Sequence, residues 1–155
     1  MLMMVMFVIE QLQLLQQIIL KKYSPIGEMG TFAKQYAESL AQVSGHVALI
    51  SDRDQFIAVA GGMKNLLGKN ISPQLENVIE KRQLIMAGKE ERAFVAMAEG
   101  EEAEYEQEAI CPIICEGDVI GSVILLSTDS KKKMGEVEQK LVQSAGGFLG
   151  RQMEQ

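Results

Sequence analysis

The chain has 155 residues and a net charge of −6 at neutral pH, from 21 acidic and 15 basic side chains. Its 47% hydrophobic and 23% charged residues are typical of one soluble globular domain with an appendage. Because the chain is acidic, 5% aromatic and without tryptophan, it is poorly equipped to neutralise phosphates or to stack on bases, and this argues against nucleic-acid binding.

Residues 1–20 are predicted to form a helix, because apolar side chains recur three and four positions apart. The stripe consists of Val5, Val8, Leu12, Leu15 and Ile19. Such a stripe indicates pairing with another helix, either of its own domain or of a partner. The opening run MLMMVMFVI lacks a basic leader and is too short to cross a bilayer, so we predict no signal peptide, no membrane contact and a cytoplasmic location.

Residues 21–29 are predicted to be a linker that leads into one domain over residues 30–155. The linker contains Ser24-Pro25-Ile26-Gly27, in which proline disfavours helical geometry in the preceding residue and glycine permits a turn.

The domain is predicted to begin with a helix and two strands. Apolar residues repeat at helical spacing from Met29 to Val43, and Gly45 then ends the helix. Residues 46–51 and 55–60 are short β-prone runs joined by a polar connection of hairpin length.

The middle of the domain is predicted to hold small helices. After a glycine pair, a short helical piece carries Leu66 and Leu67. Ser72 followed by Pro73 supplies an N-cap and a first-turn proline. The helix that begins there is expected to bury Leu75, Val78, Ile79 and Ile85.

Three further strands and a closing helix complete the prediction. The strands are expected at residues 93–98, 104–115 and 119–127, and helical spacing returns over residues 134–153. The order of helix, two strands, small helices, three strands and helix predicts an α+β fold with an antiparallel sheet of about five strands.

Few residues are of the types that carry chemistry. Cys111 and Cys115 are four apart on a predicted strand, so their α-carbons are about 13 Å apart, too far for a disulfide, and we expect reduced thiols. His46 is the single histidine and cannot form a standard structural zinc site. No metal site, catalytic group or cofactor site is predicted.

The glutamates between residues 99 and 108 are numerous enough to suggest a cation site, but they lack the spacing of a calcium loop. We expect a solvated strand and turn, with Glu104, Glu106 and Glu108 sharing one face.

The element order, together with a strand pair ending in Ile-Gly-Ser-Val-Ile-Leu-Leu, resembles a GAF domain, a small-molecule and signal-sensing module of bacterial regulators. The strings ILKKYSPIGEMG, SDRDQFIAVAGG and MGEVEQKLVQSAGGFLGRQMEQ resemble the stage V sporulation protein T family of transcription regulators. The resemblance covers residues 18–155 and implies a GAF-like fold whose first and last helices pack on one face of the sheet.

In that family, an AbrB-like DNA-binding domain lies upstream of the matched region. Residues 1–17 show none of its basic residues, so we expect this chain to lack that domain and not to bind nucleic acid by itself. The resemblance implies a sensory and oligomerising module, without enzymatic activity, that either binds an unidentified small molecule or acts through protein–protein contacts. We expect the residues that line the ligand cavity to be Phe56, Ala58, Ala60, Pro112 and Ile114.

The closing helix is predicted to pack closely on another helix, because glycine inside a helix is unfavourable by about 1 kcal/mol relative to alanine. Gly146, Gly147 and Gly150 lie within it. The residues expected at a dimer or tetramer interface are Phe32, Tyr36, Leu40, Leu141, Ala145, Gly146 and Leu149.

Two alternatives to this function stay open. The chain could be an interaction protein that pairs with full-length regulators through its helices. It could also be a thiol reductase that uses Cys111 or Cys115, since some GAF-fold enzymes reduce free methionine sulfoxide with cysteine thiolates.

Overall fold

The computed structural model describes residue 3 and residues 30–100, 104–129, 131 and 133–154. The predicted helix over residues 1–20, apart from residue 3, and the linker over residues 21–29 lie outside the described residues, and their boundaries stay predictions.

A five-stranded antiparallel sheet forms the centre of the domain, with the strand order β2-β1-β5-β4-β3. Its strands are β1 (Val47–Ser51), β2 (Phe56–Ala60), β3 (Ile85–Gly88), β4 (Gln107–Cys115) and β5 (Asp118–Ser127). The long apolar strand β5 lies in the middle of the sheet, as its continuous apolar sequence indicates.

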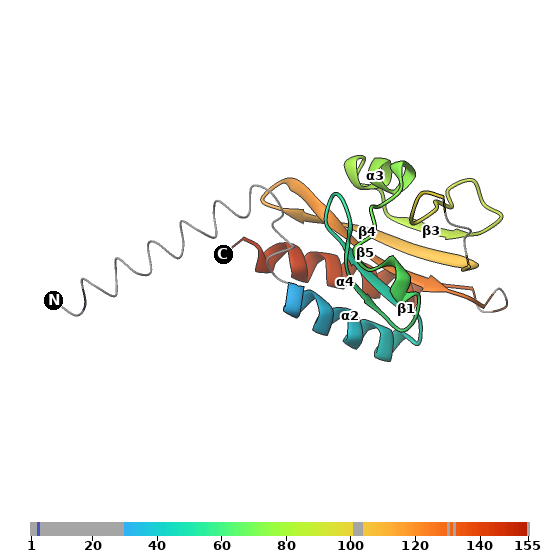
Figure 1. Ribbon diagram of the computed structural model, residues 1–155, viewed down its shortest axis with the longest axis horizontal. Helices are drawn as coiled ribbons and strands as arrows, with labels where there is room; N and C mark the ends of the chain where they lie inside the picture. The colour runs from blue at the N-terminus through green and yellow to red at the C-terminus, as the bar shows by residue number, and fades with distance from the viewer. Residues whose placement is uncertain (1–2, 4–29, 101–103, 130, 132, 155) are drawn as a thin grey trace.

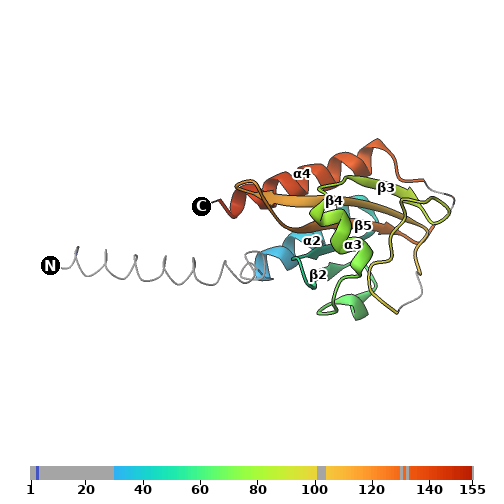
Figure 2. The same ribbon diagram turned by 90° about the horizontal axis from the view of Figure 1, so that it is seen from above.

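Helices cover both faces of this sheet. On one face lie α2 (Gly30–Ser44) and α4 (Glu136–Gln152), whereas α3 (Pro73–Glu80) lies on the other (Figure 1). The short 3₁₀ helix η2 (Lys64–Leu66) contributes Leu66 to the cluster on the α3 side. Seen from above, α2 lies toward β2 and α4 toward β4 (Figure 2). The predicted α+β architecture, with the first and last helices of the domain on one face, is confirmed.

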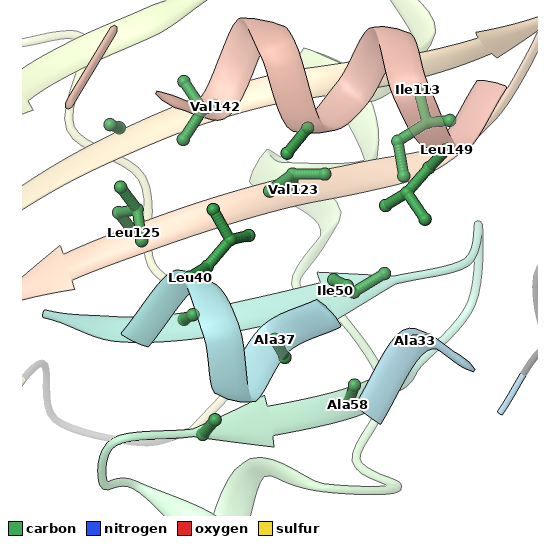
Figure 3. Packing of buried hydrophobic residues seen from close by; sticks show 14 of the residues in the cluster. Ala33, Ala37, Leu40, Ile50, Ala58, Ile113, Val123, Leu125, Val142 and Leu149 are labelled. Carbon is green, nitrogen blue, oxygen red and sulfur yellow. The ribbon is translucent and has the colours of Figure 1, made fainter. Parts of the chain in front are cut away.

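Each face of the sheet carries its own hydrophobic cluster. Ala37 and Leu40 of α2 and Val142 of α4 pack on the strands on one side (Figure 3). On the α3 side, Leu75 packs in the cluster that contains Leu49 of β1. Because neighbouring strand residues point to opposite faces, β1 and β5 contribute to both clusters.

Residues 93–98 do not form the predicted third strand. The strand next to β4 is β3, at Ile85–Gly88, so the prediction that Ile85 belongs to the preceding helix is also wrong. That helix ends at Glu80, and Arg82 has a left-handed backbone with φ of 56°, which turns the chain toward the sheet edge.

The glycines of α4 allow the helix to approach a strand rather than another helix. A β-carbon on Gly146 would lie 3.2 Å from both Cys111 Sγ and the carbonyl oxygen of Pro112. A β-carbon on Gly150 would overlap the carbonyl oxygen of Ile114. The small residues therefore place α4 directly on β4 of its own chain.

Candidate functional site

The five residues predicted to line a ligand are distributed over both faces of the sheet. Ala58 and Ala60 are buried under the α2 side, whereas Phe56 is buried in the α3-side cluster. On β4, Pro112 is buried and Ile114 is 41% exposed. The structure therefore does not gather them around one cavity, and their contact with a ligand stays a prediction.

Residues 93–98, here called the covering segment, lie over the α3 side of the sheet and contribute Met97 and Ala98 to its cluster. Backbone groups of this segment bond to side chains and to the start of α3 instead of to a neighbouring strand. Ser72 Oγ donates to the carbonyl oxygen of Ala96 at 2.5 Å, and Ser72 N donates to that of Met97 at 2.8 Å. Ser72 also caps α3 by accepting from Leu75 N, as its position before proline predicts.

The buried side chains of Tyr105, just before β4, and of Glu108, on β4, hold the same segment. Tyr105 Oη accepts from Met97 N at 2.9 Å and donates to the carbonyl oxygen of Val95 at 3.2 Å. Glu108 Oε1 accepts from Val95 N at 2.6 Å. In a sheet, the backbone amides of Val95 and Met97 would bond to a neighbouring strand. Here they bond instead to the Glu108 carboxyl group and the Tyr105 hydroxyl group.

Glu108 is the most perturbed acidic group in the described part of the chain. It is fully buried, which raises the pKa of its carboxyl group to about 8, although the bond from Val95 N opposes this rise. Burial, and secondarily the Glu108 carboxylate, also raises the pKa of Tyr105. The expectation that Glu108 is solvated is wrong, because β4 turns this side chain into the α3-side layer.

Sequence reasoning missed Glu108, although a signal was present. It directly precedes the apolar run Ala109 to Ile114 in the same strand. A glutamate adjoining a core strand is more informative than one in an acidic loop, because a buried carboxyl group persists only with a partner or a shifted pKa. Glu104, in contrast, is exposed as expected.

Among the hollows on the surface of the described residues, two are large enough to consider as ligand sites. One, of about 350 Å³, lies at the β3 edge of the sheet between Lys89 and Lys133. The other, of about 560 Å³, lies where β1, β2 and β5 meet the start of α4, and His46 and Glu138 line it. Both volumes are within the range of about 300–1,000 Å³ for small-molecule sites, but neither hollow is enclosed.

His46 is a structural residue in this fold. Its Nε2 lies 3.2 Å from Glu138 Oε1, and Glu138 Oε2 accepts from Gly135 N at 2.9 Å at the start of α4. These contacts attach the first turn of α4 to the beginning of β1. Among the described residues, no cluster of three or more His, Cys, Asp or Glu side chains is arranged to hold a metal ion.

The helical layer carries three neighbouring aromatic rings, here called the aromatic cluster: Phe32 and Tyr36 of α2, and Phe148 of α4, which stacks on both. The Phe148 ring centroid lies 5.9 Å from that of Phe32 and 5.4 Å from that of Tyr36. Phe148 remains 37% exposed. The cluster joins the two helices, and its rings remain partly exposed to solvent.

The predicted interface residues divide into two groups. Four of them are buried on the sheet of their own chain and offer no surface to a partner: Leu40, Ala145, Gly146 and Leu149. Phe32, Tyr36 and Leu141 are partly exposed. For the first group, packing within the domain accounts for the small and apolar side chains.

The two cysteines lie on the helical side of β4, where both are partly buried. Cys111 packs beneath Gly146 of α4, and burial raises the pKa of its thiol. A nucleophilic cysteine needs the opposite shift, because the thiolate is the reactive form. This environment disfavours the thiol reductase alternative for Cys111.

A family model described as "Stage V sporulation protein T C-terminal, transcription factor" matches residues 28–154. The chain belongs to this family. It is 44% identical over 140 residues to stage V sporulation protein T of Bacillus subtilis strain 168, covering 90% of this chain and 76% of that protein. The resemblance inferred from the sequence motifs is confirmed.

Solved structures show that the fold of this family member is that of a GAF domain. The GAF domain of an Acinetobacter phosphoenolpyruvate-protein phosphotransferase has a TM-score of 0.63 at 15% identity, covering 95% of this chain and 92% of that one. A type II free methionine-R-sulfoxide reductase from Thermoplasma acidophilum has a TM-score of 0.57 at 13% identity, with 81% and 94% covered. At such identities, the likeness extends to the fold alone.

Proposed function

We propose that this member of the stage V sporulation protein T C-terminal family is a sensory module that binds a small molecule on the α3 face of its sheet. The observation that carries this proposal is the covering segment, whose backbone is held by Ser72, Tyr105 and Glu108 rather than by strand pairing. A segment held by side chains can be released without breaking the sheet. Sensing requires such an element, because ligand binding must favour one of two arrangements.

Hydrogen exchange tests this location. We expect small molecules that raise the melting temperature to slow exchange at the Val95 and Met97 amides, with smaller effects on the amides in the middle of α4. A small molecule retained by the purified chain would be identified by native mass spectrometry. Protection confined to α2 and α4, or the absence of any stabilising compound in a metabolite screen, would contradict a sensor site on this face.

The second part of the proposal is self-association through the helical layer, as a dimer or tetramer. The aromatic cluster supports it, because partly exposed aromatic rings that pack against one another are typical of interface anchors. Phe32, Tyr36 and Leu141 retain their predicted role, and Phe148 joins them.

Sedimentation equilibrium of two α4 variants tests this surface. Phe148→Ser is expected to weaken association at least about tenfold, since interface anchors contribute about 2 kcal/mol or more. Val137→Ser is the matched control, because Val137 is 68% exposed on the same helix but lies outside the aromatic cluster. Equal dissociation constants for the two variants would exclude the aromatic cluster as the interface.

The proposal assigns no DNA contact to this chain alone and places its activity in the cytoplasm, where a bacterial transcription regulator works. The charge of −6 supports the first point, because DNA affinity depends on cationic side chains. No helix of the described residues is long and apolar enough to span a membrane. Fluorescence anisotropy with duplex DNA at physiological salt is expected to show no binding, and submicromolar binding would refute this part.

A further inference from the structure

On the α3 face of the sheet, where we propose the sensor site, Glu108 has an incomplete set of hydrogen bonds. Its Oε2 is the one buried side-chain oxygen or nitrogen, among the described residues, that has no hydrogen-bond partner. The other oxygen of the same carboxyl group, Oε1, accepts from Val95 N at 2.6 Å. The carboxyl group is therefore half satisfied within a fully buried side chain.

A half-satisfied buried carboxyl group is expensive for a fold to keep. A buried polar atom without a partner loses its hydrogen bonds to water and gains none in return, and the loss is greater for a charged group. An apolar side chain of similar size would avoid this cost while keeping the packing of β4. Glu108 is thus better explained by a partner that is absent from the isolated chain than by a contribution to stability.

The surroundings of Glu108 specify the chemistry of that partner. The neighbouring strands place Ala87 and Leu126 directly beside it in the sheet. The covering segment lies over it with Val95, and α3 turns Leu75 toward the same layer. Apolar neighbours around a single acidic group favour a short alkyl chain with one polar end, which would enter when the covering segment is displaced.

The polar end is best matched by a protonated amine. A carboxylate only accepts hydrogen bonds, and bonds from a cationic donor are roughly twice as strong as neutral ones. A carboxylate-bearing ligand would instead place two like charges together in an apolar layer.

We propose that Glu108 recognises a small alkylammonium ligand, with Oε2 accepting from the ammonium group beneath the covering segment. This inference rests on the sensor site proposed above and names its ligand class. The neutral acid loses its proton to solvent as the ammonium group binds, so each bound cation releases one proton. Charge is conserved, because the cation replaces the proton on Glu108.

The pH dependence of this equilibrium is set by Glu108. Tyr105 is the other titratable side chain of this layer, and its raised pKa keeps it neutral near pH 7. The residues opposite Glu108 on β3 and β5 are Ala87 and Leu126, neither of which titrates. The buried residues of α3 are the apolar Leu75, Val78 and Ile79. Below about pH 8, the affinity for a cation should therefore rise about tenfold per pH unit.

Isothermal titration of the full chain with n-butylammonium chloride tests the inference, with 1-butanol and sodium butyrate as neutral and anionic probes of the same length. We expect n-butylammonium to bind most tightly, with affinity rising about tenfold between about pH 6 and about pH 7. Titrations in two buffers of different ionisation enthalpy should report one proton released per cation.

Variants of two glutamates provide the controls. Glu108→Gln keeps the shape of the side chain but cannot ionise, so it should weaken n-butylammonium binding at least about tenfold and abolish proton release. Glu108→Met should do the same, and thermal unfolding checks that both variants fold. Glu104→Gln changes an exposed glutamate that precedes β4, and this variant should bind like the unchanged chain.

Three results would overturn the inference: butyrate binding more tightly than n-butylammonium, cation affinity that falls as pH rises, or no Glu108-dependent binding of n-butylammonium. A different result tests the sensor proposal independently of the cation inference. If another compound protects the Val95 and Met97 amides equally in the unchanged chain and in Glu108→Gln, the sensor face stands and the cation inference fails.

Discussion

The contact between α4 and β4 can be tested by placing the same substitution at two glycines of one helix. Gly150 faces β4, where an added β-carbon would lie 3.2 Å from the carbonyl carbon of Ile114 and closer still to its oxygen. Gly147 faces solvent, and its added β-carbon would meet only Arg151 Nη2, at 3.6 Å. The latter is an ordinary contact with the end of a flexible side chain.

The two alanine substitutions should change stability in opposite directions. Each gains up to about 1 kcal/mol because alanine is a better helix former than glycine. For Gly150→Ala, the new methyl group overlaps backbone that cannot rotate away, and overpacking of this kind costs about 3 kcal/mol at the upper end of its usual range. We therefore expect Gly150→Ala to lose about 2 kcal/mol and Gly147→Ala to gain about 1 kcal/mol.

Urea denaturation followed by circular dichroism at one fixed protein concentration measures both changes. The midpoint should fall for Gly150→Ala and rise for Gly147→Ala, with similar slopes, so that the shift reports stability rather than a change in exposed surface. The fixed concentration matters because self-association adds to apparent stability. If Gly150→Ala were as stable as Gly147→Ala, the close approach of α4 to β4 would be wrong.

Three further substitutions test the interior. Ser72→Ala should destabilise the domain by about 1–2 kcal/mol in urea, because it removes the cap of α3 and a bond to the covering segment, whereas the exposed Glu76→Gln should have little effect. Ser122→Ala should lower the free energy of unfolding by about 1–3 kcal/mol, because it leaves the buried Ser51 Oγ without its 2.6 Å partner. Adding Ser51→Ala should restore part of this loss. A further loss of stability in the double variant would contradict this pairing. For Glu108, the raised pKa means that the folded state holds its proton more tightly, so its contribution to stability is lost as pH rises from about 4.5 through about 8, at up to about 1.4 kcal/mol per pH unit. Glu108→Gln should remove this slope from a pH series of unfolding curves, and an unchanged slope would show that another group is responsible.

Elements defined by local signals could be predicted from the sequence. The first helix of the domain ends where Gly45 follows it, and α3 begins at Ser72 and Pro73, as capping preferences require. The β4–β5 hairpin follows from two apolar runs around a glycine turn. Each of these features depends on residues that are close together in the chain, so periodicity and turn chemistry suffice.

The covering segment could not be predicted in this way. Its sequence, AFVAMA, has strand character, but the partners of its backbone are Ser72, Tyr105 and Glu108. The edge position beside β4 is taken by β3, because the chain reverses after Glu80 and reaches the sheet at Ile85. No glycine or proline marks that reversal, so the spacing of apolar residues extends the predicted helix past its end at Glu80 to Ile85.

The candidate site was missed for the related reason that burial is decided by tertiary structure. Glu104, Glu106 and Glu108 alternate along the sequence as a solvated strand would, yet their exposure falls steadily toward the core. Composition predicts that most glutamates are exposed. Glu108 is an exception to this rule because the covering segment packs over β4 and buries its side chain.

Strand β4 is the element through which the two proposed functions would be coupled. One of its faces carries Glu108 beneath the covering segment, and its other face supports α4 through the close contacts at Gly146 and Gly150. A ligand that shifts β4 must therefore shift α4, since backbone rather than a flexible side chain limits the approach. Because α4 also carries Phe148, ligand binding should change the affinity of self-association. Linkage then requires self-association to change ligand affinity by the same factor.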